Sequence, residues 1–223
     1  MSAPKFGSMS PPALALAWWR RGGLPEAADS PDQEPEGPPE PPPELVGSRS
    51  PGVAALLEWT GDPGGHAVLD LGPSSSRTLE VYGGFARRVR FADVAMVWGA
   101  EGWKGVLDSI PPQPAQPYDF ILGWDILDRI PSEGRRRLMD RLVEVSDPAA
   151  ALHMVVRGTR EADTRPLRFE LVATDRVQYR PLGPDRPARD PILPAEMERI
   201  LEPFRVVRGF TLKGGLREYV AKR

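Results

Sequence analysis

Residues 66–93 constrain the fold more than any other part of the sequence. Residues 67–72 form a short, largely apolar run that ends in glycine, and the proline and serines after it can begin a helix, so the pattern predicts a strand, a tight turn and a helix. Residues 89–93 predict a second strand, and its last residue, Asp93, lies 23 positions after Asp70. This order, with an acid about 20 residues on, is typical of a nucleotide-binding α/β unit.

The remainder of the chain continues the alternation of strands and helices. Pro51, after the capping residue Ser50, predicts a helix start. Further helices are expected at residues 99–107, from Pro131 and from Pro194. Strands are expected at residues 106–110, 118–125 and 151–156, the first of them weak, with hairpins inside the polar insertion 159–191 and at residues 204–221.

Two segments resemble a known family. Residues 68–72, Val-Leu-Asp-Leu-Gly, are similar to the first motif of class I S-adenosylmethionine-dependent methyltransferases, an acid, any residue and then Gly-x-Gly-x-Gly. Residues 118–125 resemble the family's fourth strand, commonly an aromatic-Asp pair followed by an apolar run. The resemblance covers residues 52–223 and implies an α/β fold: a Rossmann-like methyltransferase sheet with helices on both faces and a C-terminal antiparallel hairpin, preceded here by an extended N-terminal arm.

The resemblance also implies a cofactor site for S-adenosylmethionine. Asp70 and Gly72 would border the cofactor, and Asp93 would bind its ribose hydroxyls. The Gly123-Trp124-Asp125 end of the fourth strand would face the reacting methyl group. Ser74 and Ser76 stand where the family has its second and third glycines, which changes the backbone approach to the cofactor. No residue is predicted as a general base, because methyl transfer to a nucleophilic acceptor needs mainly positioning.

The first 51 residues differ in composition from the rest. The formal charge is +3 in residues 1–24, −6 in residues 25–51 and +1 in residues 52–223. Residues 25–51 contain nine prolines and predict an extended linker. Residues 1–24 are predicted to be an anchor segment, with a short helix that carries Trp18, Trp19, Arg20 and Arg21. These side chains would pack on the domain, dock on a protein partner, or lie at a membrane surface.

Composition narrows the chemistry and the compartment. The chain has no cysteine and two histidines, His66 and His153, so neither a disulfide framework nor a metal site is expected, and His153 is interpreted as a packed core residue. No apolar run is long enough to span a bilayer, and a cytoplasmic location is expected, with peripheral contact at the cytoplasmic face of a membrane as its variant. Without cysteine, or an Asn/Asp-Pro-Pro-Tyr-type tetrad after residue 122, no nucleic-acid partner is expected.

Two main hypotheses about function follow. The favoured one is a non-catalytic methyltransferase-fold accessory or scaffold subunit that docks on a larger assembly through its N-terminal arm, since the loop has lost two glycines. The alternative is an active S-adenosylmethionine-dependent methyltransferase acting on a small molecule or a protein side chain. A third hypothesis is a site for another nucleotide, held at the helix N-terminus by the serine-rich loop.

Overall fold

The computed structural model describes residues 47–59, 65–110, 116–182 and 190–223. Contacts divide the chain into two units, Met1–Pro43 and Glu44–Arg223, and every described residue belongs to the second. The predicted anchor segment and most of the predicted linker lie outside the described residues.

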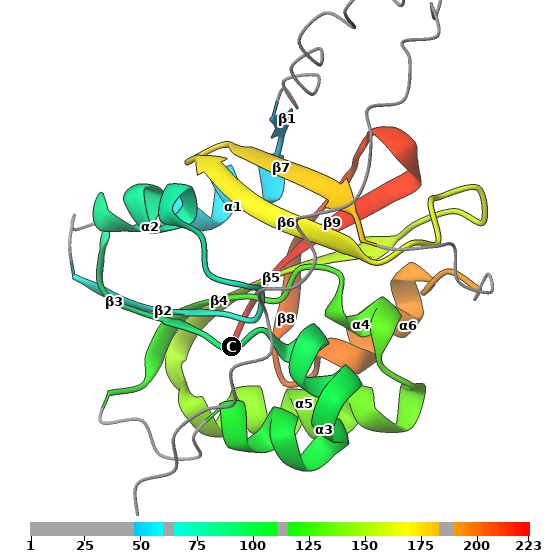
Figure 1. The fold of residues 1–223 in the computed structure, drawn as a ribbon, viewed down its shortest axis with the longest axis horizontal. Coiled ribbons are helices and arrows are strands. Elements are labelled where there is room, and N and C mark those ends of the chain that lie inside the picture. Colours follow the sequence, from blue (N-terminus) through cyan, green and yellow to red (C-terminus); the bar gives the residue numbers. More distant parts are fainter. Residues whose placement is uncertain (1–46, 60–64, 111–115, 183–189) are drawn as a thin grey trace, which may run out of the picture. The chain divides into compact units, whose positions relative to one another are not determined.

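The centre of the fold is a six-stranded sheet (Figure 1). Its strands, in spatial order, are β3 (Ala86–Phe91), β2 (His66–Asp70), β4 (Tyr118–Leu122), β5 (Ser146–Arg157), β9 (Leu216–Lys222) and β8 (Arg205–Thr211). The first four strands pair in parallel, whereas β9 runs antiparallel to both β5 and β8. The predicted parallel sheet and the closing C-terminal hairpin are both confirmed.

Each face of this sheet is covered by a separate apolar core, because successive strand side chains point to opposite faces. Val68 packs with α1 (Pro51–Leu57), α2 (Ser76–Gly83) and a small sheet. Its neighbour Leu69 packs with the helices of the other face. These are α3 (Val94–Ser109), α4 (Ile126–Arg129), α5 (Ser132–Val145) and α6 (Pro194–Leu201). Figure 1 shows the two layers on either side of the sheet, as predicted.

The small sheet contains the predicted hairpin of the polar insertion. It has the order β1 (Ser48–Arg49), β7 (Arg176–Pro181) and β6 (Leu167–Ala173), all antiparallel. The residues of β1 fall within the range that the sequence assigned to the linker. Immediately after them, Ser50 caps α1 by accepting a hydrogen bond from the Val53 N–H at 3.3 Å, as predicted.

The weak third strand predicted at residues 106–110 is wrong. The helix that was expected at 99–107 instead begins directly after β3 and includes residues 106–109. Asp93 caps its N-terminus, and a kink at Gly102 (φ 63°, ψ −149°) lets it continue to Ser109. Val106 and Ile110 were apolar because they fill the core beneath this helix. The described part of the sheet therefore ends at β3 on this side.

His153 is a buried residue of β5, as predicted. Its Nε2 lies 3.4 Å from Oε1 of Glu218 on β9. Glu218 also accepts hydrogen bonds from the Ser50 hydroxyl at 2.5 Å and the Gly52 N–H at 2.6 Å. Burial alone would raise the pKa of Glu218, but His153 and these two donors outweigh it and lower the pKa. The carboxylate thereby fastens the start of α1 to the centre of the sheet.

Candidate functional site

The carboxyl ends of β2, β3 and β4 meet at a topological switch point. The chain leaves β2 for β3 on one side and returns through α3 to β4 on the other. Open α/β sheets bind ligands in the crevice outside such strand ends. A cavity of about 340 Å³ lies there, which is near the lower limit for small-molecule sites. Its lining includes Leu71, Gly72, Asp93, Met96, Trp124, Asp125 and Phe169.

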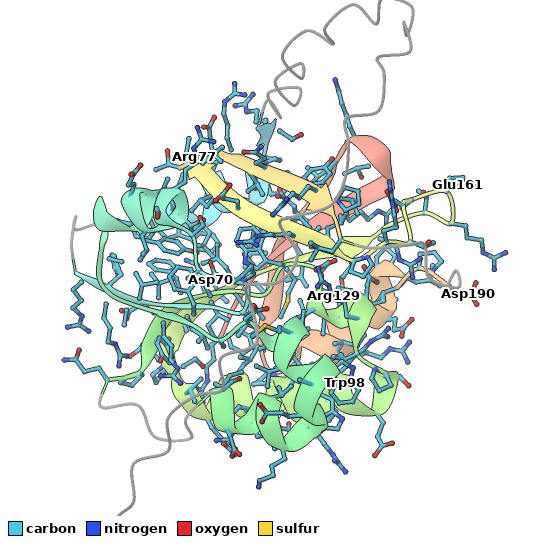
Figure 2. The ribbon with its side chains drawn as sticks, in the orientation of Figure 1. Asp70, Arg77, Trp98, Arg129, Glu161 and Asp190 are labelled. Atoms are coloured by element: carbon cyan, nitrogen blue, oxygen red, sulfur yellow. The ribbon has the colours of Figure 1, made fainter. Side chains whose placement is uncertain are left out.

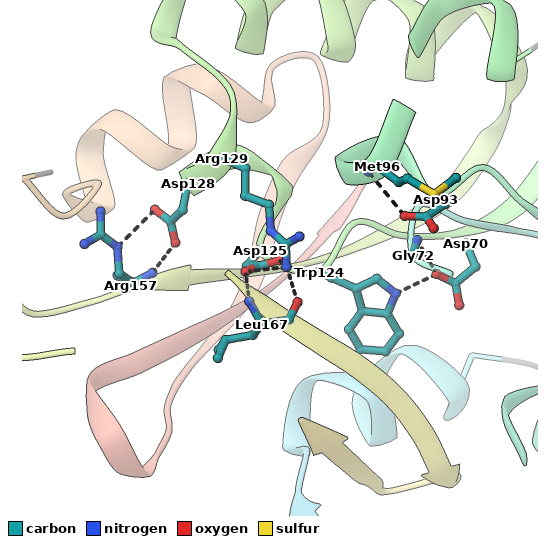
Figure 3. A network of polar contacts seen from close by, with 10 residues as sticks. All are labelled: Asp70, Gly72, Asp93, Met96, Trp124, Asp125, Asp128, Arg129, Arg157 and Leu167. Carbon is teal, nitrogen blue, oxygen red and sulfur yellow. Dashed lines mark hydrogen bonds and ion pairs between the residues drawn. The ribbon is translucent and has the colours of Figure 1, made fainter. Parts of the chain in front are cut away.

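Asp70, at the end of β2, is buried behind this cavity and does not line it. Its Oδ1 accepts hydrogen bonds from the Gly72 N–H at 2.8 Å and from the Trp124 indole N–H at 2.6 Å, and its Oδ2 accepts one from the Tyr82 hydroxyl at 2.6 Å. Figure 2 shows Asp70 in the interior, and Figure 3 shows the bond to Trp124. Burial raises the pKa of Asp70 to about 6, although the three donors act in the opposite direction.

The indole of Trp124 fills the space over the loop that follows β2. Trp124 directly follows the end of β4 with φ at 47°, and its ring stacks on Phe169 of β6 with centroids 5.3 Å apart and planes 10° apart. A Cβ atom added to Gly72 would lie 2.9 Å from the indole, which is closer than real contacts allow. Glycine is therefore needed at position 72 because this chain's own tryptophan approaches it.

Asp93 remains available toward the cavity. It adopts the left-handed conformation, with φ at 37° and ψ at 52°, at the N-cap of α3. Its Oδ1 accepts a long hydrogen bond from the Met96 N–H at 3.4 Å. No residue in the described part of the chain donates to its Oδ2, and the side chain is half-buried among the lining residues. Among the predicted cofactor-binding residues, it has the freest carboxylate oxygen.

Asp125 is occupied by the protein. Its carboxylate contacts Nη2 of Arg129 at 2.7 and 2.9 Å and accepts a hydrogen bond from the Leu167 N–H at 3.2 Å. The same Arg129 nitrogen donates to the Leu167 carbonyl, so Asp125 and Arg129 together fasten α4 to the start of β6 (Figure 3). Burial raises the pKa of Asp125, and the Arg129 guanidinium opposes this rise.

Ser74 is exposed and is not among the residues that line the cavity. The next residue, Ser75, caps α2 by accepting from the Thr78 N–H at 3.0 Å. Thr78 in turn connects this end of the helix to Leu171 of β6. The structure thus brings Gly72, Asp93 and Asp125 to one cavity, while the serines of the loop cap the helix or face solvent.

The resemblance placed Trp124 at the strand end that faces the cofactor, but it did not predict that the indole covers Gly72. Nothing in the local pattern after β4 distinguishes an aromatic residue that closes a crevice from one that simply packs in a core. The described residues contain no group of three or more potential metal ligands. They also contain no helix long and apolar enough to cross a membrane.

No protein-family model and no curated protein sequence matches this chain. Several solved structures are similar to this chain. The 1,6-didemethyltoxoflavin-N1-methyltransferase of Burkholderia thailandensis is 16% identical over 78% of this chain and 76% of its own, with a TM-score of 0.46. An S-adenosylmethionine-dependent methyltransferase of Mesorhizobium loti is 13% identical over 78% and 96%, with a TM-score of 0.48.

A third structure is the magnesium protoporphyrin IX methyltransferase of Synechocystis PCC 6803, which is 18% identical over 77% of this chain and 76% of its own, with a TM-score of 0.44. The fold itself is settled by the chain's own topology. The parallel strands, the helices on both faces and the antiparallel C-terminal hairpin are the features that the resemblance to class I methyltransferases implied. The chain has this Rossmann-like methyltransferase fold.

Proposed function

We propose that this chain is a methyltransferase-fold accessory subunit that does not transfer methyl groups and that docks on a larger assembly through its N-terminal arm. The observation that carries the non-catalytic part is the position of Trp124. Its indole is 4% exposed, bonded to Asp70 and stacked on Phe169, and it covers Gly72. A cofactor that needs the backbone at Gly72 would have to displace this ring.

Displacing Trp124 would be costly. The ring would lose a hydrogen bond to a buried carboxylate, and hydrogen bonds to charged groups contribute about 1.5–3 kcal/mol. It would also lose its stack on Phe169, worth roughly 0.5–1.5 kcal/mol beyond burial. A ligand would have to supply this free energy before it gained any affinity, so we expect binding at this loop to be weak.

The carboxylates nearest to the cavity also support a non-catalytic role. Asp70 accepts three hydrogen bonds, and Asp125 is paired with Arg129. Neither carboxylate therefore has a free oxygen that faces a methyl acceptor in the cavity. General acid–base catalysis needs such a group within hydrogen-bond reach of the proton that moves. Asp93 is the exception, and its place at the strand end suits ligand binding rather than proton transfer.

The docking part of the proposal rests on the sequence of residues 1–24. Trp18 and Trp19 lie beside Arg20 and Arg21, ahead of a proline-rich acidic linker. Tryptophan and arginine are the residues that most often dominate binding at interfaces. An anchor on a long spacer raises the local concentration of the domain at its partner. If the arm bound lipid instead of protein, it would make peripheral contact with a membrane surface.

The alternative function, an active S-adenosylmethionine-dependent methyltransferase, is favoured by one observation. The cavity of about 340 Å³ remains open beside Trp124, and Asp93 offers a free carboxylate oxygen at its rim. In this alternative the cofactor's ribose would contact Asp93, and its methionine end would take a route that avoids Gly72.

Titration calorimetry with S-adenosylmethionine and S-adenosylhomocysteine distinguishes the two functions. We expect no binding to the wild-type chain at millimolar ligand. Trp124→Gly removes the ring and suits the positive φ at this position, so we expect it to bind, and addition of Asp93→Ala should abolish that binding. Trp124→Phe is the matched control, because it keeps a ring beside Phe169. Micromolar binding to the wild type that Asp93→Ala weakens would overturn the non-catalytic proposal.

A further inference from the structure

A second cavity, of about 220 Å³, lies on the other side of Arg129 from Trp124. It is formed by the carboxyl end of β5, by α4 and by the residues that precede β6. Its polar lining consists of Asp125, Asp128, Arg129, Arg157, Asp163, Thr164 and Arg165. Figure 3 shows Arg157 and Asp128 on one side of the Asp125–Arg129 pair, and Trp124 with Asp70 on the other. The two cavities share Asp125, Arg129, Pro166 and Leu167, but Asp128 and Arg157 line only the second.

Arg157 is buried and poorly paired. It is 7% exposed, and Oδ1 of Asp128 lies 4.0 Å from its Nε. Its backbone N–H donates to Asp128 Oδ2 at 2.7 Å, but no group in the described part of the chain accepts from its Nη1 or Nη2. A guanidinium stays charged in proteins, and Arg157 lines the cavity, so its terminal nitrogens are accessible from it. These two nitrogens can therefore donate to an acceptor bound inside the cavity.

The other ions of the cavity are paired with one another, although Nε of Arg129 is buried without an acceptor in the described part of the chain. Arg129 is held by Asp125 at 2.7 Å, and Nε of Arg165 donates to both oxygens of Asp163 at 3.0 Å. Asp128 differs, because its Oδ1 accepts no hydrogen bond. The cavity thus presents one unused guanidinium edge and one unused carboxylate oxygen next to each other.

This pair matches a particular kind of ligand. The two terminal nitrogens of an arginine fit a carboxylate or a phosphate in a bidentate manner. The lining contains three acids and three arginines, so its formal charge is zero. A dianion such as phosphate would add two negative charges to the site, whereas a single carboxylate adds one and a carboxylate with an ammonium group adds none. The Oδ1 atom of Asp128 then requires a hydrogen-bond donor on the same ligand, close to the ligand's carboxylate. A volume of about 220 Å³ admits only a small molecule.

We propose that this cavity binds a small carboxylic acid that carries a hydroxyl or ammonium group on the adjacent carbon. The carboxylate is bound by Nη1 and Nη2 of Arg157, and the hydroxyl or ammonium group donates to Oδ1 of Asp128.

Titration calorimetry at constant ionic strength tests this site, with L-lactate, glycine, acetate and inorganic phosphate as probes. We expect saturable binding of L-lactate or glycine, with acetate at least fivefold weaker because it lacks the second donor, and phosphate weaker still. Arg157→Leu should weaken binding at least tenfold. Arg157→Lys keeps the positive charge and the apolar stem but lacks the two terminal nitrogens that bind a carboxylate together, so it should also bind the probes more weakly. Because it is the more conservative change, it shows whether a folding defect explains the loss in Arg157→Leu.

Arg160→Gln is the control. Arg160 lies three residues from Arg157, but its side chain is 77% exposed and pairs with Asp190. This variant should bind the probes as the wild type does. The proposal is overturned if the wild type binds none of the four probes saturably, if the Arg157 variants bind as well as the wild type, or if phosphate binds as tightly as L-lactate and glycine.

Discussion

Asp70 shows how a single carboxylate can be retained for the structure of a site rather than for its chemistry. Three donors from β2's own loop, from α2 and from the loop after β4 converge on it. It also raises the pKa of Tyr82, since burial and the neighbouring negative charge both oppose the phenolate. The carboxylate therefore holds together three segments that meet at the switch point.

The raised pKa of Asp70 predicts a specific pH dependence of stability. Its pKa rises from 3.8 to about 6, so between these values the native state binds a proton that the unfolded chain has released. The free energy of unfolding contributed by Asp70 thus falls as pH increases from about 4 to about 6, and stays low above that. A rise of this size corresponds to roughly 3 kcal/mol.

Urea unfolding of Asp70→Asn between pH 4 and pH 7.5 checks this prediction. Asparagine keeps the shape and does not titrate, so the stability of the variant relative to wild type should increase by roughly 3 kcal/mol across this range. Asp140→Asn, on the exposed face of α5, serves as the control and should run parallel to wild type. A parallel curve for Asp70→Asn would show that the native carboxyl titrates normally.

At this scale the sequence identified positions but not partners. Local pattern alone placed Asp70, Gly72 and Asp93 at or near strand ends. Asp70 is the last residue of β2, and Gly72 lies two residues after it. Asp93 was expected to end a strand at residues 89–93, but β3 ends at Phe91 and Asp93 caps α3. The partners of Asp70, Tyr82 and Trp124, are 12 and 54 residues away. The second contact forms only because β4 lies beside β2, and strand order is a property of the whole sheet that local periodicity does not report.

Among the elements, α2 and β6 are joined by an unusual connection. The Thr78 hydroxyl, in the first turn of α2, accepts a hydrogen bond from the Leu171 N–H at 3.1 Å and donates to the Leu171 carbonyl at 3.4 Å. Both residues are buried. The Thr78 side chain therefore satisfies both backbone groups of one residue in β6. This contact holds the β6–β7 hairpin over α2.

We predict that Thr78→Val destabilises the domain by about 2 kcal/mol. Valine has the same shape but leaves the two buried polar groups of Leu171 without partners, and each such group costs roughly 1–3 kcal/mol. The amide of Leu171 should also exchange its hydrogen faster. Thr211→Val, on the exposed side of β8, is the matched control and should change stability by less than about 0.5 kcal/mol. Equal effects of the two substitutions would mean that the connection contributes nothing.

The elements themselves were mostly predictable, because their signals are local. Ser50 and Pro51 marked the start of α1, and the apolar spacing after Pro194 marked α6. The expected third strand failed for a physical reason: Val106 and Ile110 are equally compatible with a strand and with the buried side of a helix. The structure shows the helix, since α3 begins at Val94 after the Asp93 cap and runs through a kink at Gly102 to Ser109.

At the scale of the whole molecule, the domain closes its own cores. Both faces of the central sheet are covered by elements of the described chain. Its exposed large apolar residues are Leu79, Met96, Leu182, Leu193 and Val207, which come from five different segments. The two adjacent tryptophans of the anchor segment are therefore not required to complete the core of the domain, which favours an external binding site for them.

The combined substitution Trp18→Ala and Trp19→Ala in the full chain tests this expectation. We expect the thermal midpoint to change by no more than about 2 °C, since substitutions outside a core alter stability by about 0.5 kcal/mol or less. The same variant should lose the proteins that co-purify with the wild-type chain from its own cells. Arg136→Ala with Arg137→Ala, two exposed positions on α5, is the control and should retain them.

The outcomes separate the three interpretations of the anchor, because each places the indole rings in a different environment. A drop of several degrees in the midpoint would mean that the rings pack on the domain. Retention of every partner at an unchanged midpoint would overturn protein docking. Flotation with anionic phosphatidylglycerol vesicles then tests the lipid variant: binding by wild type that the double substitution abolishes would assign Trp18 and Trp19 to a membrane surface, with Arg20 and Arg21 at the headgroups.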